Sequence, residues 1–293
     1  MSKKIKNTLL KTLVEDQNNE LLSNLITYNK DDKKLLVKSQ ILYNQLINYR
    51  NEKFSEEFIS LSYKTLESWN MNQRGARLSS LDAFQKSIIE NRNRIIFLKK
   101  YKIETIDTSD FEFLKKELEY LFINLKLVEE GKPKLVTFSK TLHFFLPNLL
   151  MPIDRSYTLK FFYESTDIPN HNNDDQQFEM YFDILLDFNQ FVITNNFESY
   201  KDDIFHRNIP KIIDNIIIKY VNINEKMKES IKKMNIHFKK GETDEAIKII
   251  QEGTKEFWFM VRPTPNLDKR MLAEEGGSEL LSEVISKTKG DSK

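Results

Sequence analysis

Apolar residues recur every three to four positions along most of this chain, the spacing that gathers them on one face of an α-helix. Residues 33–49, for example, place leucines and isoleucines on one broad face and lysines elsewhere. Seven glycines and seven prolines leave few breaks in this pattern, and no segment reads convincingly as a strand. The pattern predicts an all-α fold with helices over residues 5–14, 18–28, 33–49, 55–70, 82–99, 110–130, 139–146, 155–164, 175–197, 209–221, 224–240 and 243–261.

The character of the helices changes near residue 223. Residues 1–222 are predicted to form one helical body, and helix 209–221 is apolar nearly all round, which indicates deep burial. Its polar interruptions, Lys211, Asp214 and Asn215, either share a cleft with Asp154 or pair locally, and local pairing is the simpler expectation. Lys/Glu-rich helices over 223–262 predict an appended helical hairpin, and 263–293 is expected to be a mobile tail.

The most constrained stretch is residues 134–162, KLVTFSKTLHFFLPNLLMPIDRSYTLKFF. It predicts a tight turn over 134–139, an apolar helix over 140–145, a loop bracketed by Pro147 and Pro152, and a helix that begins at or after Asp154. Asp154 is therefore a candidate N-cap, where unpaired backbone N–H groups and the positive helix end favour an ionised carboxylate.

The charges around Asp154 suggest a second interpretation. Between residues 131 and 160 the chain carries five lysines and arginines, and Asp154 is its only acid. Such a basic field suits the phosphate backbone of a nucleic acid. Asp154 is thus either only a helix cap or a functional carboxylate set in a nucleic-acid surface.

The segment SKTLHFF…LPNLLMPIDRSYT resembles the hairpin, helix and catalytic-aspartate segment of the helix-hairpin-helix DNA glycosylases. Lys140-Thr141 and Pro152-Ile153-Asp154 match its two ends, over about thirty residues. The segment is also similar to a set of little-characterised bacterial proteins with a Ser-Lys-x-Leu-His-Phe…Pro…Pro-x-x-Asp pattern and an upstream Trp-x-Met, here Trp69-Asn70-Met71. The two glycines usual in glycosylase hairpins are absent, with Val136 and Phe138 close to their positions.

The resemblance implies a helix-hairpin-helix glycosylase-like body and an enzyme that hydrolyses the N-glycosidic bond of a damaged or modified base, in DNA repair or in phage defence. Asp154 would be its catalytic carboxylate. Lys140 is a weak candidate for a second catalytic group, a Schiff-base lysine, and a surface lysine on the helix is the favoured interpretation. The alternative function is a non-catalytic, all-helical module that binds DNA or protein.

Candidate DNA contacts fall in the central stretch and in an upstream loop. Arginine pairs with phosphates and aromatic rings stack on bases, so a loop with two arginines beside a tryptophan can clamp a nucleic acid. The alternative interpretation of this loop is a helix C-terminus with Gly75 near the cap and the tryptophan in the core. Basic residues over 92–102 offer a second candidate surface for phosphate contact. The predicted DNA contacts are Lys134, Ser139, Arg155, Arg74, Arg77 and Trp69.

Composition limits the kinds of binding and catalysis that this chain can carry out. The net charge of +1 limits nucleic-acid contact to local patches, and the absence of cysteine excludes disulfides, thiol catalysis and the iron–sulfur cluster of some glycosylases. His171 with Asp174 and Asp175 reads as a solvated loop, so neither a metal nor a cofactor is expected. We expect a cytoplasmic protein without a membrane span, with DNA as partner and a protein partner possible through the C-terminal hairpin or tail.

Overall fold

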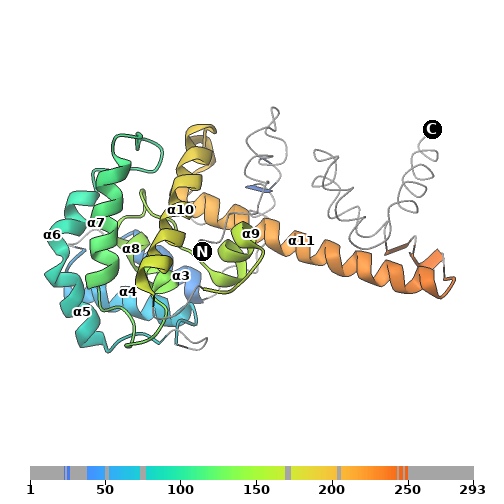
Figure 1. Cartoon of the computed structure of the whole chain (residues 1–293), viewed down its shortest axis with the longest axis horizontal. Coiled ribbons are helices and arrows are strands. Elements are labelled where there is room, and N and C mark those ends of the chain that lie inside the picture. The colour runs from blue at the N-terminus through green and yellow to red at the C-terminus, as the bar shows by residue number, and fades with distance from the viewer. Residues whose placement is uncertain are drawn as a thin grey trace. The chain divides into compact units, whose positions relative to one another are not determined.

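In the computed structural model, the described residues are 38–49, 53–72, 77–168, 173–202 and 206–242, with short pieces at 23, 25–26, 244–246 and 248–249 (Figure 1). They are helical without a strand, which confirms the all-α prediction, and one isolated bridge joins Leu78 to Val128. The helices are α3 (Lys38–Ile47), α4 (Glu56–Ser68), α5 (Leu81–Glu90), α6 (Arg92–Leu98), α7 (Phe111–Asn124), α8 (Leu135–Phe145), α9 (Lys160–Tyr163), α10 (Asp174–Ile193) and α11 (Ile209–Lys239). A π-helical turn, η2 (Arg155–Leu159), precedes α9, and a 3-10 turn, η3 (Glu198–Tyr200), follows α10.

The described residues from 26 to 218 form one compact unit, and those from 219 onward belong to a second, so α11 contributes to both. The sequence pattern predicted two helices, 209–221 and 224–240, where the structure has this one continuous helix. The segment between them contains neither glycine nor proline, and the helix ends only before Gly241, which has a φ of 77°. The predicted helix 5–14, most of helices 18–28 and 243–261, and the tail lie outside the described residues.

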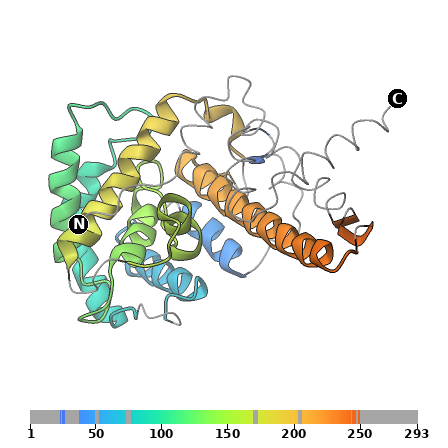
Figure 2. The ribbon, with the colours of Figure 1, turned by 45° about the vertical axis from the view of Figure 1, so that its right-hand side comes forward.

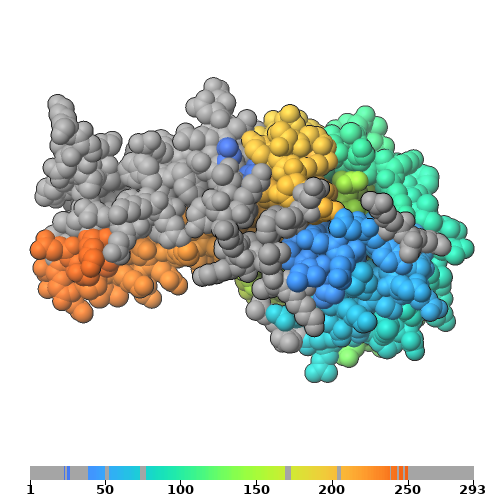
Figure 3. Space-filling model, turned by 180° about the vertical axis from the view of Figure 1, so that it is seen from behind, coloured from blue at the N-terminus to red at the C-terminus, as the bar shows by residue number. Residues whose placement is uncertain are grey.

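Helix α8 is the centre of the first unit, with α3, α4, α7 and α10 around it (Figures 1 and 2). Every one of its eleven residues is buried, and it packs against α4 and α10. Seen from behind, residues of α3, α4 and α10 form much of the visible surface of this unit (Figure 3). Edge-to-face ring pairs join Phe138 of α8 to Phe122 at 4.8 Å and to Tyr181 at 5.2 Å.

The tight turn predicted over residues 134–139 is wrong, because α8 already begins at Leu135. The backbone N–H groups of Lys134 and Leu135 both donate to Oε1 of Gln177 in α10, at 2.9 and 3.3 Å. A side chain from another helix therefore satisfies donors that a local cap would otherwise serve. The two residues near the absent hairpin glycines, Val136 and Phe138, consequently lie inside a helix.

The predicted helix 82–99 is also divided, into α5 and α6 at Asn91. The side-chain amide of Asn91 donates to the carbonyl of Ser87 at 2.9 Å, one turn back along α5. Asparagine competes with the helical backbone in this way, and α5 ends here. Asn91 also precedes α6, but its side chain does not cap that helix.

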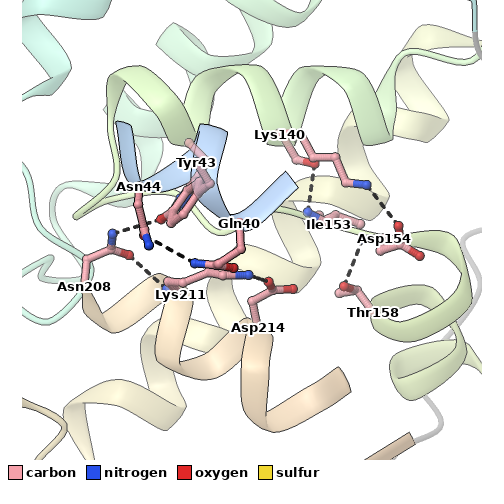
Figure 4. A network of polar contacts seen from close by, with 12 residues as sticks. Gln40, Tyr43, Asn44, Lys140, Ile153, Asp154, Thr158, Asn208, Lys211 and Asp214 are labelled. Atoms are coloured by element: carbon pink, nitrogen blue, oxygen red, sulfur yellow. Dashed lines mark hydrogen bonds and ion pairs between the residues drawn. The ribbon is translucent and has the colours of Figure 1, made fainter. Parts of the chain in front are cut away.

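His143 joins α8 to two distant parts of the first unit. Its Nδ1 lies 2.6 Å from the carbonyl oxygen of Leu150, and its Nε2 lies 2.8 Å from the hydroxyl of Tyr43 in α3. A carbonyl only accepts, so Nδ1 carries the proton and Nε2 accepts from Tyr43. The Tyr43 oxygen in turn lies 3.3 Å from the side-chain amide of Asn208 (Figure 4). Burial lowers the pKa of His143 from 6.5 to about 3.

Acid should therefore destabilise the protein through His143. The folded protein holds this imidazole neutral, whereas the unfolded chain protonates it below pH 6.5, so stability is lost as the pH falls from 6.5 towards 3. Between pH 7 and pH 5 the loss is roughly 2 kcal/mol. Urea unfolding of the wild type and His143→Gln at both pH values measures it. The wild type should exceed His143→Gln in unfolding free energy by that much less at pH 5 than at pH 7. The same difference between the two proteins at both pH values would contradict this role of His143.

Candidate functional site

Asp154 lies at the N-terminus of the turn η2 with extended backbone, at φ −122° and ψ 143°. Its Oδ1 accepts a hydrogen bond from the backbone N–H of Ser156 at 2.8 Å. Its own N–H donates to Oγ1 of Thr158 at 3.0 Å (Figure 4). This reciprocal pattern confirms the predicted N-cap.

Lys140 approaches the same carboxylate from α8. Its Nζ lies 2.9 Å from Oδ2 of Asp154, and its side chain is 8% exposed against 30% for Asp154 (Figure 4). The expectation of a surface lysine is therefore wrong. Because α8 is buried on every side, the lysine stem passes through the core and its ammonium group ends at the carboxylate. The two residues proposed as catalytic form one ion pair.

Ser139 supports the segment that leads to Asp154. It is fully buried, and its Oγ accepts from the backbone N–H of Ile153 at 2.9 Å and donates to the carbonyl of Val136 at 3.0 Å. A buried hydroxyl that is engaged twice has no surface for a phosphate, which removes Ser139 from the candidate DNA contacts. Ser139, Lys140 and His143 of α8 thus hold the chain at Ile153, Asp154 and Leu150.

Ser139→Ala should lower the free energy of unfolding by about 1–3 kcal/mol, because it leaves the buried N–H of Ile153 without its acceptor. Ser62→Ala is the matched control. Ser62 is equally buried, but its hydroxyl only donates to a helical carbonyl, that of Phe58, at 2.9 Å, so its loss should cost less than about 1 kcal/mol. Urea unfolding of both variants provides the comparison. Equal effects would show that Ser139 is not a specific support of the segment.

Asp154 and Lys140 line a pocket of about 170 Å³. A cavity of about 150 Å³ holds one benzene ring, so this pocket is of a size for a single aromatic ring. Its lining includes both apolar and polar residues, as expected of a ligand site. The apolar members are Trp69, Met71, Pro133, Val136 and Ile168, and the polar ones are Asn70, Lys140, Asp154, Arg155, Ser156 and Thr166.

Trp69 belongs to both the core and the pocket. It follows the last residue of α4, is half-buried, and packs against Tyr43 at 5.8 Å and Phe144 at 5.2 Å between ring centroids. The Nζ of Lys140 lies 5.4 Å from the centroid of the indole. Helix α4 ends here because Asn70 adopts a left-handed φ of 59°, so Asn70 has the role expected of Gly75. Arg74 and Gly75 lie outside the described residues.

Of the other predicted DNA contacts, some line the pocket and some lie outside it. Arg155 lines the pocket, and its Nε donates to the carbonyl of Thr166 at 2.7 Å. Lys134 instead pairs with Asp174 at 2.6 Å, beside a separate hollow of about 870 Å³. Arg77 is exposed but does not line the pocket beside Asp154. The structure therefore brings Asp154, Lys140, Arg155 and Trp69 together, and leaves Lys134 and Arg77 outside.

The polar residues of α11 do not join this site. Nζ of Lys211 lies 2.5 Å from Oδ2 of Asp214, which confirms the expected local pair (Figure 4). Among the described residues, no three histidines or acids are grouped so that they could hold a metal ion. His171 lies outside those residues.

Several residues that line the site, or that support it from α8, were not singled out from the sequence. His143 is one helical turn from Lys140, and this spacing is a signal that both share one face of α8. Asn70, Ser156 and Thr166 gave no local signal, because they enter the pocket from three separate segments.

No protein-family model, curated protein or solved structure matches this chain. The helix-hairpin-helix resemblance consequently stays a hypothesis carried by the motif residues. Within the described part of the chain, every helix is too short or too polar to span a lipid bilayer.

Proposed function

We propose that this chain is a DNA glycosylase-like hydrolase that removes a damaged or modified base, with Asp154 as its catalytic carboxylate. The observation that supports this most is the position of that carboxylate. It is held between the ammonium of Lys140 and the N–H of Ser156, at the wall of a pocket with room for one aromatic ring.

Base removal builds positive charge on the deoxyribose while negative charge leaves with the base. A fixed carboxylate beside the sugar stabilises that positive charge and can orient the attacking water. The base must first leave the helical stack, and an aromatic or apolar wall holds it outside the duplex. In this proposal Trp69 supplies that wall, and Arg155, which lines the same pocket, is the candidate contact for a backbone phosphate.

Lys140 acts in this mechanism as a positioning residue for the carboxylate. Its ammonium group fixes Oδ2 of Asp154, while the N–H of Ser156 fixes Oδ1. Direct attack by Lys140 on the sugar would require Nζ to leave Asp154 and lose a proton. Hydrolysis by a water oriented by Asp154 needs neither step, and it is the reaction that we propose.

The alternative is a non-catalytic DNA- or protein-binding module. It is favoured by the same contacts, because both oxygens of Asp154 have structural partners, as in a helix cap closed by an ion pair.

The full-length protein should be incubated with genomic DNA from several phages that carry normal and modified bases, and abasic sites counted with an aldehyde-reactive probe. New abasic sites in at least one DNA are expected. DNA that is bound by the protein but contains no new abasic sites would favour the binding module.

A further inference from the structure

We propose that the pocket beside Asp154 selects an uncharged planar base and excludes a positively charged, alkylated one. This substrate class rests on the proposed function, but the charge preference of the pocket can also be measured as binding alone.

The charges that line the pocket are unequal. Lys140 and Arg155 contribute two positive groups, and Asp154 contributes one negative group that is already paired with Lys140 at 2.9 Å. A ring that enters the pocket therefore meets a net positive lining. The small, half-enclosed space weakens solvent screening, so the repulsion of a cationic ring is larger there than at an open surface.

Trp69 leads to the same preference. An indole binds cations through the negative face of its π-system, and this attraction is how aromatic pockets commonly recognise positively charged ligands. Here the ammonium of Lys140 lies 5.4 Å from the indole centroid, so the protein's own cation already uses this interaction. Tyr43 and Phe144 pack against the same side chain. What Trp69 offers a ligand is an apolar stacking surface rather than a cation receptor.

The polar groups on the rest of the pocket suit a neutral heterocycle. Asn70 and Ser156 both line the pocket; an asparagine amide both donates and accepts hydrogen bonds, and so does a serine hydroxyl. Such groups hydrogen-bond to the carbonyl and amino edges of an unmodified, oxidised or deaminated base. They give no compensation for a full positive charge on the ring.

Intrinsic fluorescence gives a direct test. The chain has two tryptophans, so Trp258→Phe in the full-length protein leaves Trp69 as the reporter. The protein is titrated with 5-methylcytidine and with 3-methylcytidine. These nucleosides have the same non-hydrogen atoms and differ in the position of the methyl group, and only 3-methylcytidine is cationic at neutral pH. We expect the neutral nucleoside to quench Trp69 with a dissociation constant lower by about tenfold or more.

Two variants at Arg155 provide the matched control. Arg155→Gln removes one positive group without altering the Lys140–Asp154 pair, and should reduce the discrimination between the two nucleosides several-fold. Arg155→Lys keeps the charge and should retain it. Equal or tighter binding of 3-methylcytidine by the parent protein, or quenching by neither nucleoside, would overturn the proposal.

Base release separates this inference from the proposed function. Duplexes with one uracil, 8-oxoguanine or 5-hydroxymethyluracil represent neutral bases, and duplexes with one 3-methylcytosine or 7-methylguanine represent cationic ones. Release from the neutral set alone supports both proposals, and release from the cationic set above the enzyme-free rate overturns the substrate class. Release from no duplex counts against the hydrolase, whereas the nucleoside titration still decides the charge preference.

Discussion

Asp154→Asn is expected to lower the rate of base release by about 10²–10⁴-fold, the range that a positioned catalytic acid or base contributes. The amide has the size of the carboxylate and can still cap η2, but it carries no negative charge to oppose the charge on the sugar. Single-turnover rates on a DNA that the wild type processes measure the loss. DNA affinity, measured by fluorescence anisotropy, should change little.

The structure also predicts a cost of this substitution in stability. Asp154 accepts on both oxygens, from Ser156 N–H and from Lys140, and an asparagine has only one oxygen to offer. Its NH₂ group must face one of these two donors. The double variant Lys140→Met/Asp154→Asn removes that conflict and is the appropriate control for folding. Base release by Asp154→Asn near the wild-type rate, at an equal folded fraction, would contradict a catalytic role for Asp154.

Breaking the Lys140–Asp154 pair should have the largest effect on stability. Lys140→Met removes the ammonium and leaves a carboxylate that is 30% exposed and still bonded to Ser156, so we expect a loss of about 3 kcal/mol. Asp154→Ala leaves an ammonium that is only 8% exposed and also removes the cap, so we expect about 4–5 kcal/mol.

Urea unfolding at pH 7 of both single variants and of the double variant Lys140→Met/Asp154→Ala measures these costs. The double variant should be more stable than the sum of the separate losses implies, with a coupling energy of about 1–3 kcal/mol. Additive losses would show that the two side chains do not stabilise each other in solution, and that the contact between them is incidental to folding.

Local pattern was sufficient to predict most of the helices and the cap at Asp154. Helical periodicity is a property of each segment by itself, and Pro152 followed by Asp154 is a local start signal. The start of α8 was missed because its capping group, Gln177, lies 43 positions after Lys134. Only the packing of α10 against α8 brings that amide to the helix end.

The candidate site shows the same difference between features with a local sequence signal and features that depend on distant segments. Asp154, Lys140, Arg155 and Trp69 were selected from motif and residue type, but the burial of Lys140 was not, because lysine alone favours the surface. The partners of His143 could not be inferred either, since Tyr43 is 100 positions away in sequence. Contacts at such separations depend on how whole helices pack, and the local pattern of a single sequence does not reveal that packing.

The most direct test of the proposed hydrolase is to identify what leaves the DNA. Mass spectrometry of the small-molecule fraction, together with a count of abasic sites in the remaining DNA, should find intact free base in equal number to new abasic sites for the wild type. Both should fall at least about a hundredfold for Asp154→Asn in the same reaction time. Released nucleotides or cut strands without free base would indicate a nuclease. No release of any kind by a folded protein that binds DNA would make Asp154 a helix cap and the chain a binding module.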